Sequence, residues 1–273
     1  MIGRNDYGDK EIMKNSDSQK APVLQLKNIT KYFGGLKAVS DFDLKLKQGS
    51  LVGLIGPNGA GKTTVFNLIT GIYTPEQGDI LLNGQSLIGV KPYQIADRGI
   101  ARTFQNIRLF NDLSVLDNVR IAYHMHVSYG LAAAIFRTRS FAREEAELAD
   151  RAGQLLSIFN LQNRAPEKAR NLPYGEQRRL EIVRALATEP KLLLLDEPAA
   201  GMNPQEITKL MELIHFIRER FKLTILLIEH HMRVVMSICE RVAVMDFGEK
   251  IADCKPDEAQ CDPKVIEAYL GEE

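Results

Sequence analysis

The nine residues 56–64 constrain the fold of this chain more than any other stretch. They read Gly-Pro-Asn-Gly-Ala-Gly-Lys-Thr-Thr and fit the phosphate-loop pattern G-x-x-x-x-G-K-[ST]. An apolar run over 51–55 precedes them, and an amphipathic stretch over 65–72 follows. The motif requires this context of strand, loop and helix, so the sequence predicts an α/β fold that binds nucleotide phosphates.

Every residue of this loop is a candidate contact to a nucleotide. The glycines let successive backbone N–H groups turn inward, and the following helix adds partial positive charge at its N-terminus. Lys62 can reach the β- and γ-phosphates, and the Thr63 hydroxyl can hold Mg²⁺. The candidate nucleotide-binding residues here are Gly56, Pro57, Asn58, Gly59, Ala60, Gly61, Lys62, Thr63 and Thr64.

The composition excludes several classes of protein. Lys+Arg and Asp+Glu each number 35 among 273 residues, and this balance is unlike that of a general nucleic-acid binder. No segment approaches the roughly 20 apolar residues of a membrane span, and the polar N-terminus is unlike a secretory signal. We expect the three cysteines, Cys239, Cys254 and Cys261, to be reduced thiols of a cytoplasmic protein.

The N-terminal third predicts a tail followed by strands. Residues 1–20 are polar and read as a disordered tail, with one folded domain over 21–273. Apolar and polar residues alternate over 24–27 and 42–47, as in half-buried strands. A predicted turn over 31–35 carries Tyr32 and Phe33. These rings either cover an edge of the core or stack on an adenine base, and the residues alone leave both interpretations open.

A helical region is expected in the middle of the chain. Pro92 opens a short predicted helix over 92–98, and Ser114 with Asp117 forms a helix-start signal. The stretch 127–141 is apolar and basic, and we favour a helical hairpin of a subdomain over a surface that contacts a partner.

Two acids end a continuous apolar run over 191–198. Such a run fits a strand of a parallel sheet that is covered on both faces, and ligands bind at the carboxyl ends of such strands. Asp196 fits a ligand of Mg²⁺ through water, and Glu197 fits the base that orients or deprotonates the attacking water. A second apolar strand over 224–229 precedes His230 and His231, either of which could face a γ-phosphate.

The remaining segments complete the predicted fold. We expect a turn over 171–177, helices over 178–187 and 206–221, a hairpin over 242–252 and a last helix over about 262–271. Gln105, in the run Thr-Phe-Gln, has a side chain with donor and acceptor ends that can touch a metal-bound or attacking water.

Together these motifs resemble the ATP-binding subunit of ABC transporters, over residues 23 to about 250. The order is aromatic loop, phosphate loop, Thr-Phe-Gln, a signature-like turn, the strand with two acids, and Ile-Glu-His. The resemblance implies a P-loop NTPase (RecA-like) core, an antiparallel β subdomain and an inserted α-helical subdomain at about 92–168. It implies an ATPase with ATP and Mg²⁺ as cofactors.

The resemblance also implies roles for single residues. Phe33, with Tyr32 as second choice, is similar to the adenine-stacking aromatic. Gln105 is similar to the Q-loop residue, a metal contact, and His230 to the switch histidine. The expected catalytic residues are Glu197, His230 and Gln105, and the expected metal-binding residues are Thr63, Gln105 and Asp196. The expected signature residues are Tyr174, Gly175, Glu176 and Gln177.

Within the family the chain is most similar to the Liv-type importers of branched-chain amino acids. The signature form, the sequence after the two acids, the 124–145 insertion and the C-terminal residues carry this resemblance. It implies a peripheral subunit on the cytoplasmic face of the inner membrane, with two permease subunits, a second ATPase subunit and, indirectly, a periplasmic or extracellular solute-binding protein. Urea or amide import, lipopolysaccharide export, and soluble work on ribosomes or DNA are the alternatives.

Four residues depart from the family pattern. Pro173 replaces the signature serine, Tyr174 the first signature glycine, Asn203 the D-loop aspartate, and His231 a usual aspartate. Pro173 has neither a hydroxyl nor an N–H to offer a γ-phosphate. These changes suggest an asymmetric heterodimer, with a homodimer as the alternative.

Overall fold

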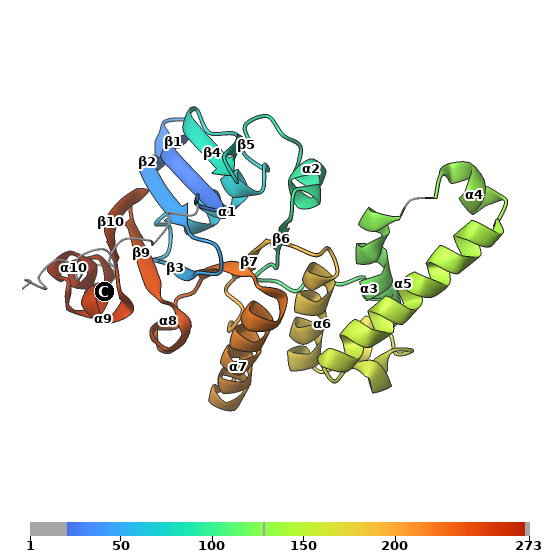
Figure 1. The fold of residues 1–273 in the computed structure, drawn as a ribbon. Helices are drawn as coiled ribbons and strands as arrows, with labels where there is room; N and C mark the ends of the chain where they lie inside the picture. The colour runs from blue at the N-terminus through green and yellow to red at the C-terminus, as the bar shows by residue number, and fades with distance from the viewer. Residues whose placement is uncertain (1–20, 128, 271–273) are drawn as a thin grey trace, which may run out of the picture.

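Two β-sheets organise the chain in the computed structural model (Figure 1), which describes residues 21–127 and 129–270. The tail predicted over 1–20 lies outside these residues, as does residue 271 of the predicted last helix. The smaller sheet is antiparallel, in the order β2-β1-β4-β5. Its strands are β1 (Leu24–Phe33), β2 (Leu36–Leu46), β4 (Gln77–Leu82) and β5 (Gln85–Ser86).

The larger sheet has six strands in the order β10-β9-β3-β8-β7-β6. Neighbours from β9 to β6 are parallel, and β10 is antiparallel to β9. The strands are β3 (Leu51–Ile55), β6 (Ile100–Arg102), β7 (Leu192–Asp196), β8 (Thr224–Ile228), β9 (Arg241–Asp246) and β10 (Glu249–Cys254). The continuous apolar runs of β3, β7 and β8 are fully buried, which confirms the predicted parallel sheet with both faces covered.

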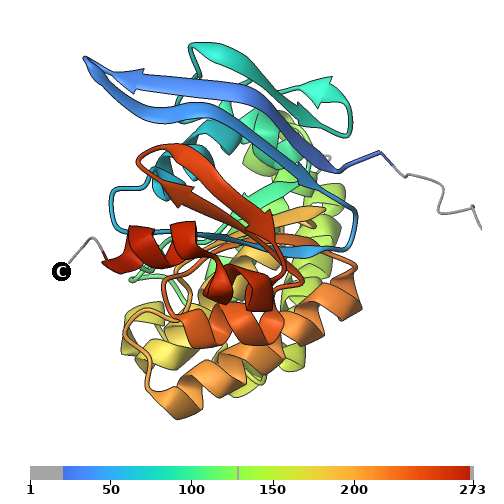
Figure 2. The ribbon, with the colours of Figure 1, turned by 90° about the vertical axis from the view of Figure 1, so that its left-hand side faces the viewer.

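Each face of this sheet packs into its own core. Because successive side chains of a strand point to opposite faces, Val52 and Leu54 join one core while Leu51 and Ile55 join the other. The first core lies between the two sheets and holds α1 (Lys62–Ile69). The second lies under α6 (Tyr174–Leu186), α7 (Pro204–Phe221) and α8 (Met232–Ile238). Figure 2 shows these layers edge-on.

A group of helices projects from the sheets beside α6 (Figure 1). It consists of α3 (Val115–Tyr123), α4 (Leu131–Ile135) and α5 (Arg139–Ile158), with 3-10 turns at His124–His126, Gln162–Arg164 and Ala169–Asn171. Ser114 caps α3 as predicted, because its side chain accepts a hydrogen bond from the Asp117 N–H at 2.9 Å. The expected helical range of 92–168 also includes β6, which pairs with β7 in the larger sheet.

The apolar part of α4 is exposed rather than packed. Leu131, Ile135 and Phe136 are 79%, 66% and 79% exposed, so they contribute nothing to the core of the helical group. Of the described helices, none is long and apolar enough to cross a membrane.

Two local predictions differ from the structure, and two helices were not predicted. The turn predicted over 31–35 is confined to Gly34 and Gly35, because β1 and β2 extend to the hairpin tip. The turn predicted over 171–177 is wrong at its end, since α6 already begins at Tyr174. Pro173 precedes α6 as its N-cap residue with φ −55°. The short helices α2 (Pro92–Asp97) and α10 (Pro263–Leu270) match prediction, whereas α8 and α9 (Pro256–Cys261) were not predicted.

Candidate active site

The phosphate loop encloses its own lysine. Lys62 Nζ donates to the carbonyl oxygens of Gly56 and Pro57, both at 2.6 Å, and the residue is 7% exposed. Gly61 has φ 99°, and a Cβ there would lie 2.5 Å from the Ala38 oxygen, so only glycine fits. No side chain caps the N-terminus of α1, and its first turn holds no acid. A helix N-terminus beside a buried ammonium suits an anionic phosphate.

Asp196 ends β7 in an ion pair that the sequence did not indicate. Arg102 Nη2 lies 2.7 Å from Asp196 Oδ2, and Arg102 Nη1 donates to Asn67 Oδ1 at 2.7 Å. Both members of the ion pair are 7% exposed. The predicted metal ligand therefore already carries one positive partner.

Glu197 lies where two other predicted catalytic residues meet. Gln105 Nε2 donates to Glu197 Oε2 at 2.7 Å, and His230 Nδ1 lies 3.5 Å from the same oxygen. The Glu197 backbone has φ 45°, an unusual value for a side chain other than glycine. Its N–H donates to the Ile228 oxygen at 2.9 Å, which ties it to the end of β8. Gln105 lies 92 positions before Glu197 in the chain, and His230 lies 33 positions after it. The fold therefore brings these three residues together.

Glu229 accepts hydrogen bonds from the backbone of the loops around this cluster. It is 0% exposed, and its carboxylate accepts from the N–H groups of Ala199 at 2.8 Å, His230 at 3.2 Å and His231 at 3.3 Å. Burial raises the pKa of this carboxyl, while the hydrogen bonds lower it by less. It fixes the backbone on which His230 stands.

A buried ion pair on α6 holds the loop that carries Gln105. Arg178 donates to the oxygens of Phe104 at 2.6 Å and Gln105 at 2.8 Å, and lies 2.7 Å from Glu181. Glu181 in turn accepts from the N–H groups of Phe104 at 3.3 Å and Arg108 at 3.2 Å. Four hydrogen bonds therefore fasten residues 104–108 to α6.

The four signature residues, Tyr174 to Gln177, form the first turn of this helix. The Tyr174 hydroxyl donates to the Ala200 oxygen at 3.0 Å, and Gln177 Nε2 donates to the Leu172 oxygen at 2.8 Å. Glu176 lies 3.3 Å from Arg164. Their contacts are thus to the helical group and to the loop after β7.

Asn203, another departure from the family pattern, is the N-cap residue of α7. Its side chain accepts from the N–H groups of Gln205 and Glu206, both at 3.0 Å, while Glu206 accepts from the Asn203 N–H at 2.9 Å. This capping box satisfies the helix start. An aspartate could make the same bonds, so the cap alone does not require asparagine.

The two candidate adenine-stacking rings lie at the tip of the β1–β2 hairpin. Phe33 is 41% exposed and packs edge-to-face on Tyr73 with ring centroids 5.0 Å apart. Lys31 Nζ lies 5.5 Å from the Phe33 centroid, and Tyr32 is 38% exposed. An exposed ring can cover a flat base, and the described contacts leave its stacking role a prediction.

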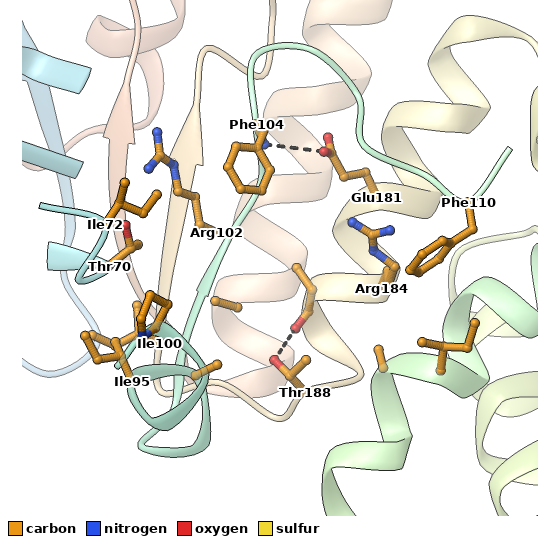
Figure 3. A pocket seen from close by; sticks show the side chains of 16 residues that line it. Thr70, Ile72, Ile95, Ile100, Arg102, Phe104, Phe110, Glu181, Arg184 and Thr188 are labelled. Atoms are coloured by element: carbon orange, nitrogen blue, oxygen red, sulfur yellow. Dashed lines mark hydrogen bonds between the residues drawn. The ribbon is translucent and has the colours of Figure 1, made fainter. Parts of the chain in front are cut away.

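An apolar groove lies between the sheets and the helical group. Its volume is about 390 Å³, and its lining includes Ile95, Ile100, Phe104 and Phe110. Figure 3 shows Phe104 on one side and the pair of Arg184 and Phe110 on the other. The Arg184 guanidinium lies 5.5 Å from the Phe110 centroid, and burial lowers its pKa. Because Phe104 adjoins Gln105, the groove borders the loop that carries the predicted catalytic residue Gln105.

The comparisons with known proteins fit this arrangement. A family model described as ABC transporter matches residues 39–200, which is more than half of the chain. The chain belongs to the ATP-binding cassettes of ABC transporters. A second model, described as branched-chain amino acid ATP-binding cassette transporter, matches residues 249–273 of the cassette.

Similar cassettes serve named transport systems. The cassette is 47% identical to the high-affinity branched-chain amino acid transport ATP-binding protein LivG of Escherichia coli K12, over 92% of this chain and 98% of that protein. It is 45% identical, over the same shares, to BraF of Pseudomonas aeruginosa, which has the same description. The lipopolysaccharide export ATP-binding protein LptB of E. coli K12 is 35% identical, again over 92% and 98%.

A solved structure confirms the fold. The ADP conformation of MJ1267, an ATP-binding cassette of an ABC transporter, matches with a TM-score of 0.80 and 30% identity over 92% of this chain and 99% of that one. The α/β fold predicted from the phosphate loop is therefore confirmed, and the cassette is the ATP-binding subunit of a transporter.

Proposed function

We propose that this cassette hydrolyses ATP and thereby drives the uptake of branched-chain amino acids. The observation that carries the proposal is the shared oxygen of Glu197, which contacts both Gln105 and His230 at the end of β7. A carboxylate in contact with a neutral amide and an imidazole can accept a proton from water and pass a proton on to a neighbouring group.

Each residue of the site then has a distinct role. Glu197 orients and deprotonates the attacking water, and Gln105 holds that water or a metal-bound one. His230 faces the transferred phosphoryl group, and Lys62 with the loop N–H groups binds the phosphates. These groups lie beyond the ends of β3, β6, β7 and β8, four neighbouring strands of the larger sheet.

The donor set also fits Mg²⁺. The Thr63 hydroxyl, the Gln105 amide and the Asp196 carboxylate are oxygen ligands of the kind that Mg²⁺ prefers, and Thr63 is exposed at the start of α1. These residues would hold Mg²⁺, which would supply positive charge beside the phosphates of ATP.

The second half of the site comes from another cassette. In this proposal the first turn of α6, Tyr174 to Gln177, contacts ATP held by the partner subunit. Pro173 has no N–H to donate, and Asn203 has no charge, so a second, different ATPase subunit is favoured over a homodimer. ATP-dependent homodimers of the purified chain with full ATPase activity would contradict the heterodimer.

The permease docks on the groove beside Phe104. This surface is apolar, borders the loop of Gln105 and lies between the sheets and the helical group. In our proposal two permease subunits span the inner membrane, the cassettes lie on its cytoplasmic face, and a solute-binding protein outside the membrane contacts only the permeases.

Branched-chain amino acids are the favoured solutes. The support is the 45–47% identity to LivG and BraF, against 35% to LptB, and the match at the C-terminus. Co-purification with the membrane subunits, followed by uptake of leucine, isoleucine, valine and urea, distinguishes this proposal from urea import. Uptake of urea alone would contradict it.

Two substitutions test the catalytic assignment. Glu197→Gln should abolish ATP turnover and keep ATP binding, because the amide cannot accept the proton of water. His230→Ala should lower turnover, whereas the matched control His231→Ala should not, since His231 has no contact with the Glu197 carboxylate among the described hydrogen bonds and ion pairs. Normal turnover in Glu197→Gln would refute its role.

A further inference from the structure

Arg102 joins three elements that surround the candidate metal ligand. It ends β6, and its guanidinium contacts Asp196 at the end of β7 and Asn67 on α1, each at 2.7 Å. The two contacts use separate nitrogens, Nη2 and Nη1. One side chain thus ties the phosphate-loop helix to the strand that carries both acids.

The guanidinium is held away from water. Its side chain is 7% exposed, and its central carbon lies 5.4 Å from the Phe66 ring and 5.0 Å from the Phe104 ring. Its Nε atom is buried and has no hydrogen-bond partner in the described part of the chain. Because arginine stays protonated in proteins, a full positive charge is fixed beside Asp196.

This charge opposes a second cation at the same carboxylate. Interaction between charges varies inversely with distance and is weakly screened at a buried site. A divalent cation at Asp196 would lie within a few ångströms of the guanidinium. Its repulsion by the guanidinium would be twice that of a singly charged cation.

We propose that Arg102 is the resident counter-ion of Asp196 and prevents the nucleotide-free site from taking up a divalent cation. The phosphates of ATP add the negative charge that allows metal and guanidinium to share the carboxylate. The proposal rests on the metal-binding role of Asp196 given above. Arg102 acts through Asp196, so it is a positioning residue rather than a catalytic one.

The test measures metal binding without nucleotide. Mn²⁺ is added stepwise to the full chain free of ATP, and free Mn²⁺ is followed by electron paramagnetic resonance. Arg102→Gln removes the charge and can still donate to Asp196, so it should bind Mn²⁺ about tenfold or more tightly than the natural chain. Arg102→Lys retains a charge and should bind Mn²⁺ as weakly as the natural chain.

A second substitution locates the metal. Asp196→Asn in the Arg102→Gln background should abolish the gain, because the gained site contains this carboxylate. A gain that survives Asp196→Asn, or unchanged or weaker Mn²⁺ binding in Arg102→Gln, would overturn the proposal. A purely structural role for Arg102 would lower the melting temperature and leave Mn²⁺ affinity unchanged.

Another variant covers the case in which Arg102→Gln does not fold. Asn67→Asp keeps the shape and the contact with Arg102 but adds a negative charge, which offsets the guanidinium and should also tighten Mn²⁺ binding. Unchanged binding in a folded Asn67→Asp chain contradicts the proposal. ATP hydrolysis by the natural chain is measured separately, so its failure would contradict the proposed function and leave the Mn²⁺ result intact.

Discussion

Glu181→Gln tests whether the buried ion pair on α6 holds the catalytic loop. Glu181 and Arg178 are 2% and 1% exposed and lie 2.7 Å apart. The amide keeps the shape of the side chain and can still accept from the N–H groups of residues 104 and 108. It places an N–H donor against the guanidinium, however, and leaves a buried positive charge unpaired.

The structure sets the size of the expected effect. Breaking a buried pair by removing one charge costs about 3–5 kcal/mol. For a chain of this size about 1 kcal/mol shifts the melting temperature by roughly 2–4 °C, so we expect a fall of roughly 6 °C or more. Thermal unfolding followed by circular dichroism measures it.

A matched control is available on the surface. Arg164 and Glu167 form an ion pair with the same i,i+3 spacing at 2.9 Å, but they are 43% and 36% exposed. Glu167→Gln should therefore change stability by less than about 1 kcal/mol. If Glu181→Gln destabilises no more than Glu167→Gln, the buried pair does not anchor the loop and the reasoning is refuted.

A functional readout separates anchoring from stability. The loop fastened by this pair carries Gln105, whose amide contacts Glu197 at 2.7 Å. At a temperature where Glu181→Gln is folded, we expect ATP turnover to fall while ATP binding at the phosphate loop is retained. Equal losses of both would indicate general disorder instead.

Three further predictions concern other parts of the fold. Asn203→Ala should cost about 1 kcal/mol in urea unfolding, because it removes the cap of α7, whereas Asn203→Asp should be nearly neutral. Burial raises the pKa of Glu229, so the unfolded chain loses the proton of this carboxyl at a lower pH than the folded chain does. Stability should therefore fall as the pH rises above about 4.3, the unfolded pKa, and through the folded pKa. This fall should be smaller in Glu229→Gln, and an identical profile would contradict this. A thiol reagent should modify exposed Cys261 in the native chain and reach Cys239 only on denaturation, because burial raises the Cys239 pKa to about 12; rapid native labelling of Cys239 would show that it is accessible.

Local sequence patterns predicted the sheet well. The runs over 51–55, 192–195 and 225–228 are apolar along their whole length, and a buried parallel strand needs such a run. The cap at Ser114 could also be predicted, because its partner Asp117 is three positions away. Both signals act within a few residues and need no knowledge of the rest of the fold.

The contacts that organise the site could not be predicted in this way. Arg178 and Glu181 lie in a helix whose sequence pattern assigns these two side chains no role, yet their loop partners lie 73 to 77 positions earlier. Arg102 likewise pairs with Asp196, 94 positions later. A single sequence contains no spacing rule for such pairs, because the sheet order brings them together. The start of α6 was predicted too late for a local reason, since proline favours both turns and helix starts.

The relative strengths of these contacts determine how the catalytic loop can move. Residues 104–108 are joined to α6 by four partly buried hydrogen bonds to charged groups. Among the side-chain hydrogen bonds of the described residues, Gln105 is joined to the residue after β7 by one, to Glu197. Hydrogen bonds to charged groups contribute about 1.5–3 kcal/mol each, and Gln105 is exposed to competing water. If α6 shifts relative to the sheet, the single exposed bond breaks first. We therefore expect the loop to move with α6, and Gln105 to leave Glu197, if the two parts separate.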